Sequence, residues 1–333
     1  MPTENDWRTL RQLVFERSAP QGTLTEGVAQ AAIVGGVAHI ALNRAPSLEP
    51  WLREATEERA MIDLVLSRAE TTLAQTLEKA KVGPVMLLKG SASSRLLYAS
   101  SMERERRDID ILVAEESFER VITVLDQSGW TAKGEAWWQQ RDASRYEVPM
   151  ARKFGSLEVE CDVHRRLMLY RHLPINTDTL LSRGQPLPDR PFSLPCPLDL
   201  FLHTALHATM NGYMVPLRSW LDLAKLIQGE HIDLNRLVTR AIAWECPTVA
   251  WAACWVLNDW FDLTIQAPVI EALAPNRAVT QALKALLTGQ NAHVLTDKLP
   301  NSTTRAAVKS LVLGAEEPSK WLLEHLSLRL VGR

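Results

Sequence analysis

Two aspartates stand one residue apart at the start of an apolar stretch, Asp108 and Asp110 in RDIDILV. The alternation predicts a strand over residues 108–114, with both carboxylates on one face and Ile109 and Ile111 on the other. Carboxylate oxygens suit Mg²⁺, and a pair of such ions can stabilise the attacking and leaving oxygens of an in-line displacement at phosphorus. Because an exposed strand gives the same spacing, this chemistry needs further groups from elsewhere in the chain.

A phosphate-binding turn is predicted upstream of this strand. PVMLL, at residues 84–88, is a short apolar run between turn residues and indicates a buried strand. Lys89, Gly90 and Ser91 follow, and SASSRLLYA indicates a helix that begins with Ser91 as its N-cap. The start of a helix offers backbone N–H groups and a positive dipole end to phosphate.

A third strand can supply another carboxylate. SLEVECDVHRRL alternates, so its apolar residues share one face and its polar residues, Glu158, Glu160, Asp162 and His164, share the other. Asp162 is the candidate third carboxylate on this strand, and Glu160 is the competing choice on the same face. The alternative reading of all these carboxylates is a set of surface charges without a metal.

Basic residues near these segments can neutralise phosphate charge, and arginine is well shaped for bidentate phosphate contacts. The alternative is ordinary surface charge. The residues concerned are Lys89, Arg104, Arg106, Arg107, Arg165 and Arg166.

Further polar groups are expected on helices in the second half of the chain. His203 and His207 lie four residues apart and so share a helical face, which Asn211 extends. We expect them to line a cleft or to form hydrogen bonds between helices. A zinc site is disfavoured because it needs a third ligand and usually an adjacent glutamate. The helix with Trp220, Asp222 and Lys225 is also expected to face the cleft, although a buried Asp222 would need a structural partner.

The elements that must position these residues indicate an α+β fold. Residues 1–81 have helical periodicity, which Gly83 and Pro84 end. Residues 82–185 form the predicted catalytic core: a small mixed β-sheet with flanking helices, including one from residue 115 to 127. The pattern from 130 to 150 indicates irregular strands or a hairpin. A proline-rich connector, 186–197, leads to residues 186–333, a predicted C-terminal helical bundle that forms a cleft wall.

Composition sets limits on location and partners. The 333 residues carry a formal net charge of −2, which argues against coating nucleic acid through bulk positive charge. The four cysteines lack a disulfide-type spacing, so we expect them to be reduced and mostly buried. The N-terminus does not resemble a secretory signal, and no run of about 18 apolar residues indicates a membrane helix. A cytoplasmic protein without a membrane partner is expected.

The order of these motifs resembles a known superfamily. KGSA, then RDIDILV, then ECDVHRRL is similar to the pattern of the DNA polymerase β-type nucleotidyltransferases. LKGSA with Tyr98 downstream, the DID strand and the D-x-H ending resemble, more narrowly, a bacterial family of uncharacterised nucleotidyltransferases. LFLHTALHATMNG and LRSWLDLAKLI extend the resemblance, which covers roughly residues 80 to 265.

This resemblance implies roles for individual residues. Gly90 and Ser91 would hold the triphosphate of an NTP. Asp108, Asp110 and Asp162 would be the catalytic, metal-binding carboxylates for Mg²⁺ or Mn²⁺, and Asp162 could also take the proton of the acceptor hydroxyl. The remaining residues expected to contact the nucleotide or line the cleft are Lys89, Arg107, His164, His203, His207 and Asp222.

The expected reaction is transfer of a nucleoside monophosphate from an NTP to a hydroxyl or phosphate, with release of pyrophosphate. Transfer of the γ-phosphoryl group is the close alternative, and a non-catalytic nucleotide-binding protein is the other. The acceptor stays open among tRNA, peptide, protein and small molecule, and so does the oligomeric state. A tRNA acceptor predicts a basic groove that joins the Arg104–Arg107 segment to the helical domain. A peptide or small acceptor predicts a narrower cleft lined by His203, His207 and Trp220.

Overall fold

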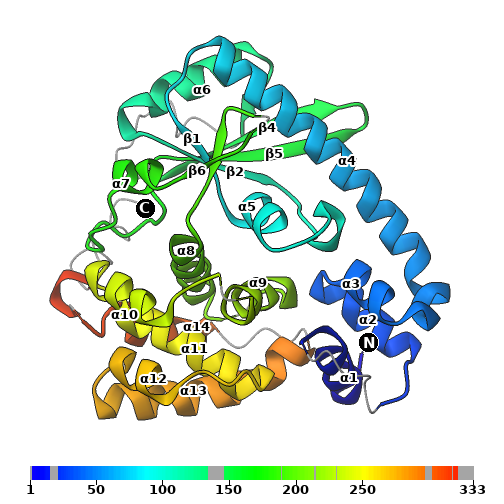
Figure 1. Ribbon diagram of the computed structural model, residues 1–333, viewed down its shortest axis with the longest axis vertical. Helices are drawn as coiled ribbons and strands as arrows, with labels where there is room; N and C mark the ends of the chain where they lie inside the picture. The colour runs from blue at the N-terminus through cyan, green and yellow to red at the C-terminus, as the bar shows by residue number, and fades with distance from the viewer. Residues whose placement is uncertain are drawn as a thin grey trace. The chain divides into compact units, whose positions relative to one another are not determined.

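The computed structural model describes residues 2–15, 22–133, 146–188, 190–213, 215–229, 231–296, 302–316 and 318–321. The chain forms two compact units (Figure 1). The first contains Met1–Glu57, His172–Pro174 and Phe201–Arg333, and the second contains Glu58–Arg171 and Ile175–Leu200. Each unit is therefore built from segments that are separated along the chain.

The second unit is organised around a mixed β-sheet with helices beside it, which confirms the predicted α+β class. Within the described residues the sheet has seven strands in the order β3-β4-β5-β2-β1-β7-β6. Its strands are β1 (Val85–Leu87), β2 (Ile109–Val113), β3 (Thr131–Ala132), β4 (Glu147–Phe154), β5 (Leu157–His164), β6 (Gln185–Pro186) and β7 (Phe192–Leu194). Its helices are most of α4 (Glu49–Lys79), α5 (Lys89–Leu96), η2 (Ser101–Glu103), η3 (Glu115–Ser117), α6 (Phe118–Gln127) and α7 (Thr177–Ser182).

The three strands predicted from apolar patterns all form. All residues of β1 and β2 are buried, so these short runs form the sheet centre, while β5 alternates between exposed and buried positions as a half-covered strand does. The expected hairpin has counterparts in β3 and β4, which pair antiparallel, but residues 134–145 lie outside the described part of the chain. Hydrophobic side chains of β1, β2, β5 and α6 are buried: Val85, Leu87, Ile109, Ile111, Val113, Val121, Leu125, Cys161 and Val163.

Two local predictions need correction. The left-handed residue after α4 is Lys81, with φ of 50°, and not Gly83; the amide of Val82 then bonds the carbonyl of Leu77 at 3.1 Å. The proline-rich stretch predicted as a connector contains β7, which pairs in parallel with β1. Three residues between prolines give too short a periodic pattern to identify a strand, and it is the pairing with β1 and β6 that defines it.

The first unit is helical. Its elements are α1 (Glu4–Phe15), α2 (Glu26–Gly35), α3 (Ala38–Arg44), η1 (Pro46–Leu48), most of α8 (Pro197–Met210), α9 (Leu217–Gln228), α10 (Leu234–Ala243), α11 (Pro247–Phe261), α12 (Ala267–Leu273), α13 (Arg277–Thr296) and α14 (Ser302–Leu313). Aromatic rings fill its interior: Trp220 packs against Tyr213, Trp260 and Phe261 with centroids 5.7–6.0 Å apart. In the described part of the chain, every helix is too short or too polar to cross a membrane.

Candidate active site

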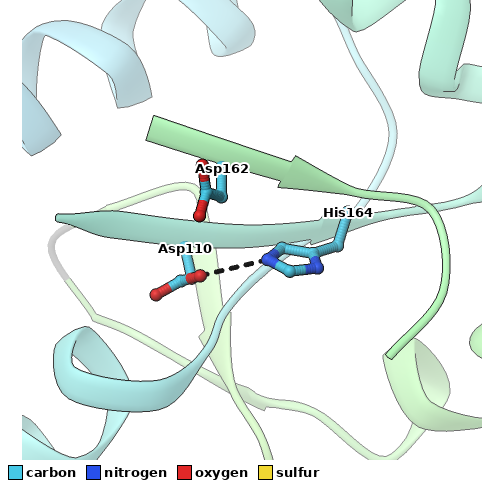
Figure 2. A group of neighbouring side chains, drawn as sticks. All are labelled: Asp110, Asp162 and His164. Carbon is cyan, nitrogen blue, oxygen red and sulfur yellow. Dashed lines mark hydrogen bonds and ion pairs between the residues drawn. The ribbon is translucent and has the colours of Figure 1, made fainter. Parts of the chain in front are cut away.

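Strand register brings the predicted carboxylates together at the sheet centre. β2 and β5 run parallel with Asp110 opposite Asp162 and Leu112 opposite His164. Paired residues and residues two apart on a strand share a face, so Asp110, Asp162 and His164 all project to the same side (Figure 2). Their ligand atoms lie within 4.8 Å of one another.

Asp110 is buried, with 1% of its surface exposed. Its Oδ1 accepts a hydrogen bond from the Lys89 ammonium at 2.5 Å and lies 3.0 Å from His164 Nε2. Its Oδ2 is buried and has no hydrogen-bond partner among the described residues. Burial by itself would raise the pKa of Asp110, but Lys89 and then His164 outweigh it and hold the pKa well below its usual range. Asp110 is therefore ionised and keeps one oxygen without a partner.

Lys89 reaches Asp110 because of the turn between β1 and α5. The amide of Leu88 bonds the carbonyl of Asp110 at 2.9 Å, which places the next residue beside that carboxylate. Lys89 has φ of 42°, a left-handed conformation that costs a residue with a side chain about 1–3 kcal/mol. Burial lowers the pKa of Lys89, but Asp110 has the larger combined effect and raises it. The ammonium thus stays charged at the centre of the site.

Asp162 has the opposite electrostatic character to Asp110. It is half-buried, and burial followed by repulsion from Asp110 raises its pKa from 3.8 to about 7. A carboxyl with such a pKa can exchange a proton near neutral pH, which suits a general base. Near neutral pH the sheet therefore holds one ionised carboxylate, Asp110, beside another, Asp162, that can accept a proton.

Glu147 is a member of this site that the sequence analysis missed. It lies opposite His164 in the β4–β5 pairing, and its Oε2 is 3.3 Å from His164 Nδ1. His164 is buried between Glu147 and Asp110, with the Tyr146 ring 5.8 Å from its own. A signal was present in the expected hairpin, because the antiparallel partner of a functional residue shares its face. Without the register, however, the partner could not be chosen.

Asp108 and Glu160 differ from this central group. Asp108 lies directly before β2 and is half-exposed, and it is outside the set of ligand atoms within 4.8 Å. Its role as a metal ligand stays a prediction. Glu160 is exposed and forms an ion pair with Lys133 at the surface, where solvent weakens such a pair.

Ser91 is not the N-cap of the helix, because α5 begins two residues earlier, after Leu88. Its hydroxyl is buried and donates to Glu70 Oε1 at 2.7 Å. The same oxygen accepts from Arg106 Nη1 at 2.5 Å. A Cβ at Gly90 would lie 3.4 Å from Arg106 Cγ, at ordinary van der Waals distance, so this arginine lies directly beside the turn. The Ser91 hydroxyl is held by the protein, which leaves the backbone of the turn for the predicted phosphate contact.

The predicted basic residues have several environments. Arg104 and Arg106 are buried, which contradicts a basic groove along the whole Arg104–Arg107 segment. Arg107 is exposed and lines a pocket of about 180 Å³ with residues of α4 and β5. Arg165 lies over the Phe118 ring, 5.1 Å from its centroid.

The predicted cleft residues of α8 and α9 belong to the first unit, whereas Asp110, Asp162 and His164 belong to the second. His203 is buried and His207 is half-buried, with the Asn211 amide donating to the His207 carbonyl at 2.9 Å. Asp222 is buried. Trp220 is fully buried in the aromatic core, so the expectation that it lines an acceptor cleft is wrong. Burial of its large apolar ring among the rings of Tyr213, Trp260 and Phe261 stabilises this arrangement.

A search of family models matched residues 23–262 to the uncharacterised nucleotidyltransferase family. The chain therefore belongs to that family. The match begins well before the expected residue 80, so it includes helices ahead of β1. No curated protein and no solved structure matched the chain.

Proposed function

We propose that this protein transfers a nucleoside monophosphate from an NTP to an acceptor hydroxyl or phosphate and releases pyrophosphate. Family membership supports nucleotidyl transfer in general terms. The observation that carries the proposal is the pairing of Asp110 with Asp162 on adjacent parallel strands, with Asp110 Oδ2 buried and without a hydrogen-bond partner among the described residues.

The residues present fit a divalent cation. An ionised buried carboxylate oxygen without a partner has lost its hydration, and a hard cation is the group that best replaces it. Asp110 and Asp162 would hold the ion, with Asp108 as a further proposed ligand. Bound there, Mg²⁺ or Mn²⁺ would neutralise phosphate charge in the transition state.

The chain's own residues then divide the work. Asp162 would accept the proton of the acceptor oxygen as that oxygen bonds to the α-phosphorus. The bond from the α-phosphorus to the bridging oxygen breaks, and pyrophosphate leaves with the electron pair. Lys89 would keep Asp110 ionised throughout. The backbone N–H groups at the start of α5, including that of Gly90, would orient the phosphates.

The test is label transfer with each NTP. The protein would be incubated with Mg²⁺, an extract of its host and one α-labelled NTP at a time, and the labelled product would be identified by mass. We expect an added nucleotide and loss of at least about 100-fold in rate for Asp162→Asn, since a general base contributes about 10²–10⁴-fold. Glu160→Gln is the matched control, because Glu160 is exposed on the same strand, and it should retain the wild-type rate.

Other outcomes would replace the proposal. Phosphate alone on the acceptor, seen with γ-labelled NTP, would indicate a kinase reaction. NTP binding without turnover, unchanged in Asp110→Asn and Asp162→Asn, would indicate a non-catalytic nucleotide-binding protein.

A further inference from the structure

We infer that Lys89 is a built-in cation of the active site, which takes the place of one of the two metal ions and leaves room for a single divalent ion. This inference rests on the proposed function, because it concerns how the same carboxylates are neutralised. It begins with Asp110, whose two oxygens have unequal surroundings.

The first step concerns the occupied oxygen. Asp110 Oδ1 receives the Lys89 ammonium at 2.5 Å and the His164 imidazole at 3.0 Å. A carboxylate oxygen that already contacts two protein nitrogens at hydrogen-bond distance has little space for a metal ion. A Mg²⁺ ion would have to lie about 2.0–2.1 Å from that oxygen. Only Oδ2 remains without a partner among the described residues. Asp110 can therefore contribute one oxygen to one ion.

The second step concerns charge. Asp110 and Asp162 lie on paired positions, and Glu147 lies beside His164. The Lys89 ammonium supplies one positive charge beside these carboxylates. In a site with two metal ions, one of the ions would supply that charge instead. The Lys89 side chain is 25% exposed and Asp110 is 1% exposed, so solvent screens this attraction only weakly.

The third step concerns the backbone. Lys89 has a positive φ, a conformation that glycine adopts without cost. Strained residues concentrate at functional sites. The strain at Lys89, next to a buried carboxylate, therefore indicates that the charge of its side chain has a function. The turn geometry alone would favour glycine at this position, so we attribute the presence of lysine to its long, charged side chain.

The test counts Mn²⁺ ions on the nucleotide-free, full-length protein by electron paramagnetic resonance. We expect wild type to bind one ion with an uncoupled six-line spectrum, because two ions about 3.5–4 Å apart would be exchange-coupled. Lys89→Met removes the charge and keeps much of the stem. It should bind Mn²⁺ roughly tenfold more tightly or better, since one repulsive charge close to the ion is gone, and it should admit a second, coupled ion.

Two further variants define the site. Lys133→Met is the matched control, because Lys133 is a lysine whose carboxylate partners, Glu158 and Glu160, lie at the surface. The Lys133→Met protein should bind Mn²⁺ as wild type does. Asp162→Asn should weaken binding in both the wild-type and the Lys89→Met background, which shows that the counted ion lies at the carboxylate pair.

Two coupled ions in wild type, or a folded Lys89→Met variant that binds Mn²⁺ no more tightly than wild type, would overturn the inference. If Lys89→Met does not fold, the wild-type count decides alone, and Lys89→Arg, which keeps the charge, should reproduce it. The ion count and the label-transfer experiment test different proposals. Nucleotide transfer by a protein that binds two coupled ions would refute only the role of Lys89. A protein that binds one ion but transfers no nucleotide would refute only the proposed reaction.

Discussion

Asp110 and Asp162 are the same amino acid on neighbouring strands, yet their surroundings give them opposite acid–base properties. Asp110 is buried against Lys89 and His164, which lower its pKa. Asp162 is near Asp110 itself, and burial with this repulsion raises its pKa to about 7. Pairs of titratable groups whose pKa values are pushed apart are typical of acid–base catalysis. At the level of single residues, this asymmetry separates the candidate site from a pair of ordinary surface carboxylates.

The raised pKa of Asp162 predicts a pH-dependent stability in the absence of metal. A carboxyl whose pKa rises on folding from 3.8 to about 7 contributes stability that is fully present below pH 3.8 and is lost as the pH rises through about 7. Asp162→Asn cannot titrate. Relative to wild type, its melting temperature in EDTA should therefore rise as the pH increases from 4 to 8.

Two measurements check this explanation. Glu160→Gln, an exposed position on the same strand, should show no such trend. Saturating Mg²⁺ should reduce the difference between Asp162→Asn and wild type at pH 8, because the ion binds the charged carboxylate of wild type. Parallel pH profiles for Asp162→Asn and wild type in EDTA would contradict the assignment.

Helix α4 is joined to the site by a buried set of charges. Arg106 donates to Asp63 at 2.5–3.0 Å and to Glu70 at 2.5 Å, and its side chain has no exposed surface. Ser91 of α5 bonds the same Glu70, and Arg95 and Arg190 also pair with it. These contacts connect α4, the turn between β1 and α5, and the segment just before β2, so they fix the geometry of the turn against the strand.

Removing Arg106 should therefore be costly. Arg106→Met removes the arginine that pairs with Asp63 and one of the three that pair with Glu70. Breaking a buried pair in this way costs about 3–5 kcal/mol. Arg53→Met on the same helix is the control, because Arg53 forms only an exposed pair with Glu49, and it should change the free energy of unfolding by less than about 1 kcal/mol. Urea unfolding measures both. Equal effects of the two substitutions would show that the buried network does not stabilise the fold.

On the scale of the whole molecule, the central site residues belong to one unit. Lys89, Asp110, Glu147, Asp162 and His164 all fall within Glu58–Arg171. His203, His207 and Asp222 belong to the other unit, and the expectation that they contact the nucleotide or line the cleft stays a prediction. The boundary between the units near residue 57 falls inside α4. The boundary predicted from the sequence is at residue 81, near the end of that helix.

This division predicts a separable function. A fragment of residues 58–200 contains the complete sheet, the buried charges and the carboxylate pair, so it should unfold cooperatively in urea and bind Mn²⁺. Asp110→Asn should abolish that binding. Nucleotide transfer to the acceptor should be lost in the fragment if the helical unit supplies acceptor contacts. A fragment without a cooperative transition would show that the sheet requires the helical unit to fold.

The sequence by itself determined the local features of this protein: the α+β class, the strands at residues 85–87, 109–113 and 157–164, and the faces on which Asp110, Asp162 and His164 lie. Alternation and turn residues encode these features because they depend on neighbours a few positions away. Only the tertiary structure decided which residues meet. Strand register sets Asp110 opposite Asp162 and Glu147 opposite His164. The turn before α5 brings Lys89 to Asp110, and packing buries Ser91, Arg106 and Trp220. Each of these contacts joins segments that are distant in the sequence. A shift of one residue in a strand would turn its side chains to the other face, so no local pattern can specify such contacts.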